Sequence, residues 1–196
     1  MRRIAISLLL IGACCGGCSE SPTVQPSALS AGAPLSQNVM TVTRPVNGRC
    51  ATSFTFLATP PPEGCATFQA APSAFLAITG ECQIAHLGRS TTEAVQQQIF
   101  ALNAAGQPLL VDGQPVVREL RNCGTFTAAN GDHLHFTAVG PTRAGNSPGT
   151  VLFEGSFAFV GGSGRFESSS GTATFSGGAS LMSNTGDFSF EGSLLF

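Results

Sequence analysis

Apolar and polar residues alternate in the segment 150–160, near the end of the chain. Its large apolar residues fall on odd positions: Val151, Phe153, Phe157 and Phe159. Polar residues such as Glu154 and Ser156 fall on even positions. Because successive side chains of a β-strand point to opposite faces, this pattern predicts a strand with one buried face.

Similar patterns mark several other segments of the chain. Alternating or densely apolar runs occupy residues 51–58, 75–87, 123–128, 132–139, 172–175 and 187–196. The segment 91–101 fits either a further strand or a short helix. Many short strands separated by turns with Gly and Pro are typical of antiparallel barrels and sandwiches, and closure into a barrel removes exposed strand edges. The sequence therefore predicts an all-β fold, an antiparallel β-barrel of about eight strands.

Two dipeptides mark the tightest expected turns. Asp112-Gly113 lies between two short apolar runs, and Asn130-Gly131 lies between two alternating ones. Such dipeptides favour a two-residue hairpin, because both central residues of a type I′ turn have positive φ. We therefore expect a type I′ turn at Asn130-Gly131. Asp132 is expected to accept hydrogen bonds from backbone N–H groups of the same turn.

Composition limits the classes of function. Only 10% of the residues are charged, against about 25% in ordinary globular domains. All nine basic residues are arginine, and the 15 Phe residues must supply the aromatic core because the chain has no Trp or Tyr. With a net charge of -2, the chain lacks the basic surface that nucleic-acid binding requires.

The first residues have the form of a signal sequence. Two arginines precede an apolar run, residues 4–13, that is too short to span a bilayer. The motif Ile11-Gly12-Ala13-Cys14 resembles the bacterial lipobox. The resemblance implies cleavage before Cys14 and a lipid attached to its sulfur. An ordinary secretory signal, cut near Ala13 or Gly17, is the alternative.

The chain accordingly divides into three expected parts. Residues 1–13 form a lipoprotein signal peptide, and residues 14–40 form the acylated cysteine with a flexible Ser/Pro-rich tether. Residues 41–196 form the β-barrel domain. This organisation predicts an exported protein of the bacterial cell envelope, whose partner is a membrane, held through the lipid anchor at the outer membrane or a periplasmic face.

Four cysteines lie in the expected barrel: Cys50, Cys65, Cys82 and Cys123. In an exported chain they favour disulfides over free buried thiols, and three pairings are possible. We expect Cys50–Cys65 and Cys82–Cys123, because these pairs join neighbouring segments. Zinc is disfavoured because this part of the chain has no C-x-x-C pair. The segment Cys15-Gly16-Gly17-Cys18 has that form but lies at the acylation site.

Several turn and strand motifs resemble a known family of barrels. They are Ala85-His86-Leu87-Gly88-Arg89 with Thr91, then Asn130-Gly131-Asp132, and finally Gly161-Gly162-Ser163-Gly164-Arg165-Phe166 with Gly171. Across residues 75–196 the chain resembles the allene oxide cyclase-like and dirigent-like barrels, above all their bacterial secreted relatives. The resemblance implies an eight-stranded, calycin-like barrel with an apolar interior. Plant members accept a fatty-acid epoxide or phenolic radicals, but their catalytic residues match no positions here.

Three histidines are candidates for a polar site. His133 and His135 share a face of their expected strand, and with His86 they could hold a metal or form an acid–base pair. The alternating Leu134 and Phe136, however, are expected to face the interior of the barrel. That arrangement turns His133 and His135 outward.

The turn that follows the segment 75–87 is a second candidate. It could place the imidazole of His86 and the guanidinium of Arg89 together at a mouth of the barrel. Alternatively the turn is only structural, and Arg89 pairs with an acid such as Glu93 or Asp132.

Carboxylates and glycine loops offer no catalytic constellation. Glu154 and Glu191 recur in the repeated motif Phe-Glu-Gly-Ser, and paired carboxylates can serve as acid and base. Both, however, lie on the polar faces of their expected strands. The loop 161–165 is rich in glycine but lacks the Gly-Lys-Ser/Thr and the following helix of a phosphate-binding loop. We assign no catalytic residue, no cofactor and no metal from the sequence.

Three functions fit these observations. The first is a non-enzymatic module that binds an apolar small molecule or a partner protein. The second is a cyclase or isomerase that folds an oxidised lipid in the barrel cavity. The third is a structural envelope lipoprotein with a packed core. A Phe-lined cavity with one or two inward polar groups would favour the first two functions, and a filled core would favour the third.

Overall fold

The computed structural model describes residues 42–61 and 65–196 of the chain. The expected signal peptide, Cys14 and the tether lie outside these residues. Within the described segments, no helix combines the length and the apolar character needed to cross a membrane.

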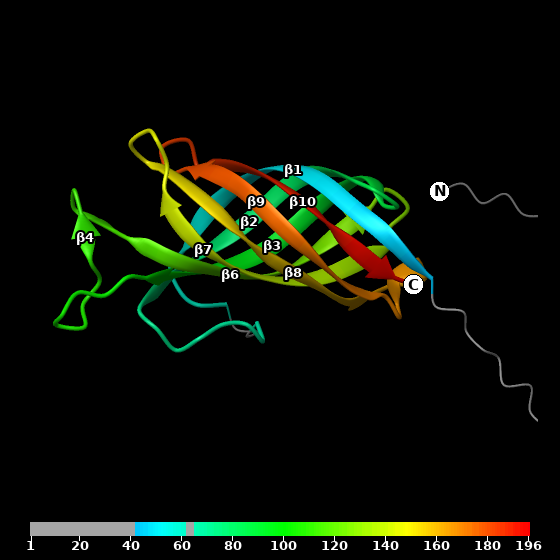
Figure 1. Cartoon of the computed structure of the whole chain (residues 1–196), viewed down its shortest axis with the longest axis horizontal. Coiled ribbons are helices and arrows are strands. Elements are labelled where there is room, and N and C mark those ends of the chain that lie inside the picture. Colours follow the sequence, from blue (N-terminus) through cyan, green and yellow to red (C-terminus); the bar gives the residue numbers. More distant parts are fainter. Residues whose placement is uncertain (1–41, 62–64) are drawn as a thin grey trace, which may run out of the picture. The chain divides into compact units, whose positions relative to one another are not determined.

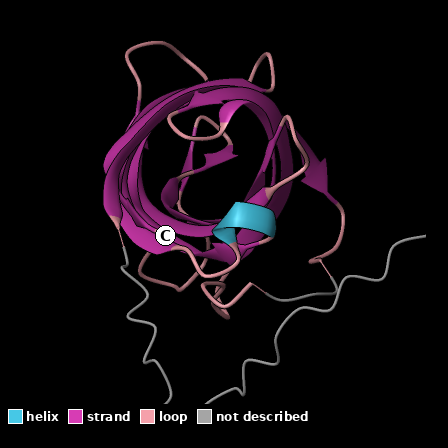
Figure 2. Cartoon of the chain, turned by 90° about the vertical axis from the view of Figure 1, so that its right-hand side faces the viewer, coloured by secondary structure: helices cyan, strands magenta, loops and turns pink. Residues whose placement is uncertain are grey.

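Eight antiparallel strands form a closed barrel (Figures 1 and 2). They are β1 (Thr43–Leu57), β2 (Ser73–Ile84), β3 (Gly88–Phe100), β6 (Val117–Ala128), β7 (His133–Ala144), β8 (Thr150–Gly162), β9 (Ser170–Ser180) and β10 (Thr185–Leu195). Each of these strands pairs with the next one along the chain, and β10 pairs with β1 to close the sheet. A small hairpin, β4 (Leu110–Val111) and β5 (Gln114–Pro115), lies between β3 and β6. The predicted all-β barrel of about eight strands is confirmed.

The strands alternate between inward apolar and outward polar residues, as the sequence pattern predicts. In β8, Phe157 and Phe159 are buried, whereas Glu154 and Ser156 are exposed. The segment 91–101, for which strand and helix both fit, lies almost entirely in β3. The strands are 11 to 15 residues long, longer than the short ones predicted. Burial of the inward apolar surface, worth about 25 cal/mol per Å², is the main source of stability.

Side chains plug one end of the barrel, which we call the closed end. The short 3₁₀ helix η1 (Gly164–Phe166), between β8 and β9, lies over this end (Figure 2). Its Phe166 is completely buried. The ring of Phe166 packs against that of Phe196, with 5.7 Å between the ring centroids. Five more buried side chains fill this end: Val46, Ile84, Leu87, Leu134 and Leu194.

The opposite end, which we call the mouth, carries two long connections. Residues 58–72, which we call the strap, join β1 to β2, and their described part lies against the outside of the barrel (Figure 1). Residues 101–116, which we call the arm, join β3 to β6, contain the β4–β5 hairpin and project away from the barrel (Figure 1).

The two disulfides pair the cysteines differently from the prediction. Cys50 is bonded to Cys82, and Cys65 is bonded to Cys123. The predicted pairs Cys50–Cys65 and Cys82–Cys123 are therefore wrong. Cys50 and Cys82 are direct partners in the register of β1 and β2, whereas Cys65 lies in the strap and meets Cys123 on β6. Nearness in sequence misleads here, because the pairing depends on strand register and on the path of the strap.

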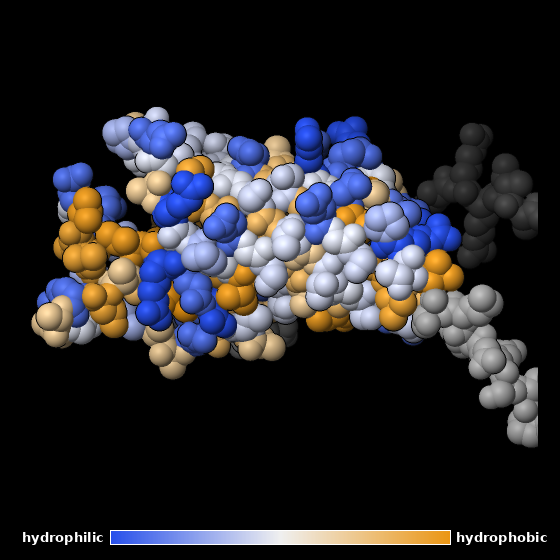
Figure 3. All heavy atoms as spheres, in the orientation of Figure 1, coloured by the Kyte–Doolittle hydropathy of each residue, from blue (hydrophilic) through white to orange (hydrophobic). Residues whose placement is uncertain are grey.

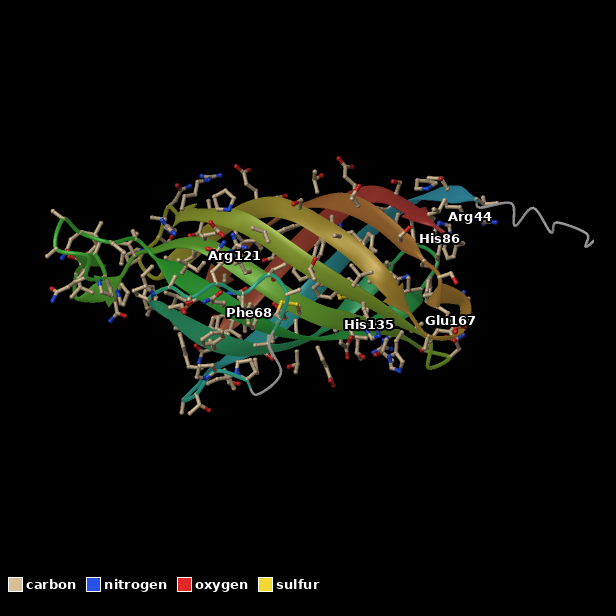
Figure 4. All side chains as sticks on the ribbon, turned by 90° about the horizontal axis from the view of Figure 1, so that it is seen from below. Arg44, Phe68, His86, Arg121, His135 and Glu167 are labelled. Atoms are coloured by element: carbon tan, nitrogen blue, oxygen red, sulfur yellow. A yellow bond between two sulfur atoms is a disulfide. The ribbon has the colours of Figure 1, made fainter. Side chains whose placement is uncertain are left out.

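Polar contacts also hold the strap against β3 and β6. Gln97 points outward from β3 but is only 1% exposed. Its side-chain amide accepts from the N–H of Gln69 at 2.9 Å and donates to the carbonyl of Gln69 at 2.7 Å. Arg121 of β6 donates to the carbonyl of Thr67 at 2.8 Å, on the side of the barrel where Phe68 lies (Figure 4). The strap thus covers an outer face of the barrel.

The two predicted hairpin dipeptides form different turns. Asp112 and Gly113 have φ values of 51° and 77°, so both lie in the left-handed region that a type I′ turn requires. At Asn130-Gly131, only Gly131 has a positive φ, of 87°, and its N–H donates to the carbonyl of Ala128. The predicted type I′ turn at this site is wrong. The loop is longer, and Gly131 takes the left-handed position that follows a type I turn.

Candidate functional site

The half of the barrel next to the mouth encloses a cavity. Inward residues of all eight long strands line this cavity. Its volume is about 80 Å³. A single water needs roughly 10–15 Å³. Its lining combines large apolar residues such as Leu76 and Phe136 with the small residues Ala94, Ala179 and Gly186.

Four phenylalanines form what we call the aromatic wall of the cavity: Phe153, Phe157, Phe175 and Phe188. They come from β8, β9 and β10. The ring of Phe157 lies 4.9 Å from that of Phe175 and 6.0 Å from that of Phe188, measured between centroids. Mutual packing fixes the rings, so this wall presents a continuous apolar surface to the cavity.

Three amide side chains form what we call the amide wall: Gln96, Gln98 and Asn122. Gln96 and Gln98 come from β3, and Asn122 comes from β6, where it is the direct register partner of Gln96. In the order of strands around the barrel, β3 and β6 lie opposite β9 and β10. The amide wall and the aromatic wall therefore face each other across the cavity.

The amide wall has unused hydrogen-bonding capacity. Asn122 is only 9% exposed, and its buried Oδ1 has no hydrogen-bond partner among the residues that the structure describes. Two hydroxyl groups of the cavity, by contrast, bond the backbone. Thr52 donates to the carbonyl of Gly186 at 3.0 Å, and Thr142 donates to the carbonyl of Val117 at 2.6 Å.

The described residues that line the cavity include no ionisable side chain. General acid–base and nucleophilic catalysis require a titratable or activated group within reach of the bound molecule. The cavity offers apolar contact and neutral hydrogen bonds instead. This chemistry suits binding.

Exposed apolar side chains surround the mouth. On the arm, Leu109, Leu110 and Val111 are 41%, 56% and 57% exposed, and apolar surface gathers there in Figure 3. Phe56, near the end of β1, and Met182, between β9 and β10, are also exposed. An apolar molecule therefore meets apolar surface before it enters the cavity.

His133 and His135 lie on the outer face of β7, as the alternation with buried neighbours predicts. The Nδ1 of His133 lies 3.1 Å from Oγ1 of Thr127, and the Nδ1 of His135 lies 2.8 Å from Oγ1 of Thr125. The two imidazole rings are parallel, with 6.4 Å between centroids. They belong to the outer surface and not to the cavity.

His86 lies in the turn between β2 and β3, at the closed end (Figure 4). The turn lies at an end of the barrel, as one alternative has it, but buried side chains plug that end. The Nε2 of His86 lies 3.0 Å from the carbonyl oxygen of Pro45, and its ring packs edge-on against Phe196. Across residues 42–61 and 65–196, no three His, Cys, Asp or Glu side chains group in a way that could hold a metal.

Arg89 pairs with a different acid from the two suggested by the sequence. Its guanidinium lies 3.3 Å from the carboxylate of Glu81 on β2, and both side chains are exposed, so the pair adds little stability. The carboxylate of Asp132 instead accepts from the side chain of Asn130 and pairs with Arg165 at 3.3 Å. Asp132 thus links the β6–β7 turn to η1, and does not accept from the backbone as predicted.

Glu154 and Glu191 are exposed on the outer faces of β8 and β10, as predicted. Their register partners on β9 are Ser176 and Thr174, respectively. Both carboxylates border a shallow groove on the outside of the barrel. They cannot act on a molecule held in the cavity.

The amide wall is not apparent from the sequence. The run Gln96-Gln97-Gln98 has no assigned face while both a strand and a helix fit the segment 91–101. Once the segment is a strand, alternation sends Gln96 and Gln98 inward and Gln97 outward, beneath the strap. Asn122 lies one residue before the predicted strand 123–128, so it also has no predicted face.

No protein-family model matches the chain, and no curated protein matches it significantly. The closed barrel of eight antiparallel strands is consistent with the calycin-like architecture that the motifs imply.

Proposed function

We propose that this chain is a non-enzymatic module that binds an apolar small molecule inside its barrel. The observation that carries this proposal is the cavity between the aromatic wall and the amide wall, beside the mouth. Ligand sites are typically concave and mostly apolar, with a few polar groups that orient the ligand. The cavity has this composition.

The cavity favours binding over a purely structural role. Close packing is the more stable arrangement, because an unfilled space forfeits van der Waals contacts. The closed end is packed in this way, since Leu134, Phe166 and Leu194 are each 0% exposed. In the other half, the same chain leaves a space of about 80 Å³ unfilled. A cyclase or isomerase would also need a cavity, but the lack of an ionisable lining residue within the described chain favours a binder.

The test begins with residues 41–196, which contain every strand and both disulfides of the closed barrel. This fragment is purified from an oxidising periplasm and examined by native mass spectrometry, and an organic extract is analysed alongside. A co-purified apolar molecule, or uptake of one added afterwards, is the expected result. A fragment that is empty and takes up no added apolar compound would contradict the proposal.

We also propose that the protein is exported and anchored through a lipid on Cys14. Two disulfides support an oxidising compartment, because the cytosol keeps thiols reduced. The signal-like N-terminus and the lipobox support the anchor. The variant Cys14→Ser should move the protein from the membrane fraction to the soluble periplasmic fraction. Retention of this variant in the membrane would show that Cys14 is not the anchor.

We further propose kinship with the allene oxide cyclase-like and dirigent-like barrels. The eight-stranded barrel supports it, and so does the position of the shared motifs. The motifs at 85–89, 130–132 and 161–166 form three connections of the closed end, where the Asp132–Arg165 ion pair joins two of them. They therefore support a common architecture rather than common chemistry. An experimental structure with another strand number or order would contradict this kinship.

A further inference from the structure

The cavity presents two chemically different walls to a bound molecule. The aromatic wall offers only apolar contact, whereas the amide wall offers neutral hydrogen-bond donors and acceptors. A purely apolar molecule would displace water from the amide wall without replacing its hydrogen bonds. Polar groups that lose water without gaining a partner weaken binding. A better ligand carries a polar group of its own.

Asn122 shows where that polar group would bind. Its side chain is nine-tenths buried, and its Oδ1 has no partner among the described residues. Gln96 lies directly opposite Asn122 in the β3–β6 register. Opposed residues of antiparallel strands have Cβ atoms about 4.5–5.5 Å apart, so one small polar group can reach both amides.

The cavity also discriminates by charge. An ionised group inside it would lose its hydration shell and find no counter-ion, since no described lining residue is ionisable. Arg118 and Arg143, in the strand ends nearest the mouth, are exposed and do not line the cavity. The interior therefore favours uncharged molecules.

Building on the proposed function, we propose that the ligand is a small uncharged molecule with an apolar body and one hydroxyl, carbonyl or amide group. Its body lies against the aromatic wall, and its polar group bonds Gln96 and Asn122. The space of about 80 Å³ suits a short chain or a single ring. Any longer part of the molecule extends through the mouth.

The test compares three six-carbon probes of similar length: hexan-1-ol, 1-chlorohexane and hexanoate. Each is titrated into fragment 41–196, with both disulfides intact, and binding is followed by NMR chemical shifts. At neutral pH, hexan-1-ol should bind at least about tenfold more tightly than hexanoate, because only the carboxylate must be desolvated as an ion. Hexanoate should bind more tightly as the pH falls through the pKa of hexanoic acid, since the protonated form is uncharged.

Variants of the amide wall test the position of the polar group. Gln96→Met and Asn122→Leu should each weaken hexan-1-ol binding about fivefold, the usual effect of one lost hydrogen bond. Neither should weaken the binding of 1-chlorohexane. The matched control is Gln83→Met, an exposed glutamine on the outer face of β2, which should change no affinity. Using two separate variants keeps the test decisive if one of them does not fold.

The outcomes separate this inference from the proposed function. If hexanoate binds as tightly as hexan-1-ol, or if the variants weaken hexan-1-ol and 1-chlorohexane equally, the neutral-ligand inference is overturned while the binding function stands. If none of the three probes binds to the unmodified fragment, both are overturned.

Discussion

Two buried amides of this barrel have opposite environments. Gln97, 1% exposed, bonds the backbone of Gln69 twice and also donates to Oγ of Ser73 at 3.0 Å. Asn122, 9% exposed, has no partner for its Oδ1 within the described part of the chain. An unsatisfied buried polar group costs about 1–3 kcal/mol, whereas a satisfied one adds about 1 kcal/mol per hydrogen bond. The barrel therefore gives up stability at Asn122, which lines the cavity, and gains it at Gln97, which does not.

This contrast predicts opposite effects for the same kind of substitution. Asn122→Leu removes the unpaired acceptor and should raise the free energy of unfolding by about 1 kcal/mol. Gln97→Leu leaves the strap groups that its amide bonds without hydrogen-bond partners. It should therefore lower the free energy of unfolding by about 2–3 kcal/mol. Guanidinium unfolding of the oxidised fragment 41–196 measures both values. Equal losses in the two variants would show that the Asn122 amide is satisfied in solution.

Phe166 is the residue on which the closed end depends. It is 0% exposed, and the Arg165 guanidinium lies 4.8 Å from its ring centroid. Phe166→Ala should lower the free energy of unfolding by about 3–5 kcal/mol, because the fixed strands around it cannot collapse into the space. The control is Phe56→Ala at the mouth, where the ring is 58% exposed and the loss should stay below about 1 kcal/mol. Thermal unfolding measures the stability of both variants. Similar losses in the free energy of unfolding would mean that the closed end is not a packed plug.

At the scale of whole elements, the sequence predicts what depends on local periodicity. Alternation in the segment 150–160 is enough to orient β8, because each residue's face follows from its neighbour's. The turn at Asn130-Gly131 is located correctly, but its type depends on one further loop residue. The disulfide pairing and the course of the strap depend on contacts between distant segments, which periodicity does not encode. The amide wall falls in the same class, since Gln96 meets Asn122 only through the β3–β6 register.

The strap is the element whose order depends most on a disulfide. Cys65 and Cys123 are 58 residues apart, and Cys50 and Cys82 are 32 apart, so loop entropy assigns each bond about 4 kcal/mol. Their local effects should differ. Replacing Cys65 and Cys123 by alanine should speed amide hydrogen exchange in the strap. In β1 and β2, the amides should still exchange only as fast as the global unfolding of the variant allows. Replacing Cys50 and Cys82 by alanine is the control.

In that control, exchange in the strap should not speed up by more than the loss of global stability explains, because the disulfide from the strap to β6 remains. Hydrogen exchange followed by mass spectrometry resolves the two regions. If both double variants loosen the strap equally, the Cys65–Cys123 bond does not act locally.

At the scale of the whole molecule, the barrel is divided along its axis. The closed end is packed by large side chains and covered by η1, and the mouth is surrounded by exposed apolar residues of the arm and turns. Between them, the inward residues leave the cavity unfilled. The closed end supplies stability, which allows the other half to remain open for a ligand.

This division predicts that a larger side chain is tolerated at one end and not at the other. Ala94 lines the cavity, whereas Ala128, at the closed end of β6, is 4% exposed and belongs to the packed core. Ala94→Leu should extend into the empty space, change the free energy of unfolding by less than about 1 kcal/mol, and abolish hexan-1-ol binding. Ala128→Leu has no space to enter and should lower the free energy of unfolding by about 1–3 kcal/mol.

Guanidinium unfolding and the NMR titration, applied to both variants, separate two models of the interior. A cavity that persists in solution gives a stable Ala94→Leu variant that binds nothing. A barrel that has collapsed around its apolar side chains has no space at either position, so both variants lose stability alike. That result would count against a preformed site, because a ligand would then have to open the barrel before it could bind.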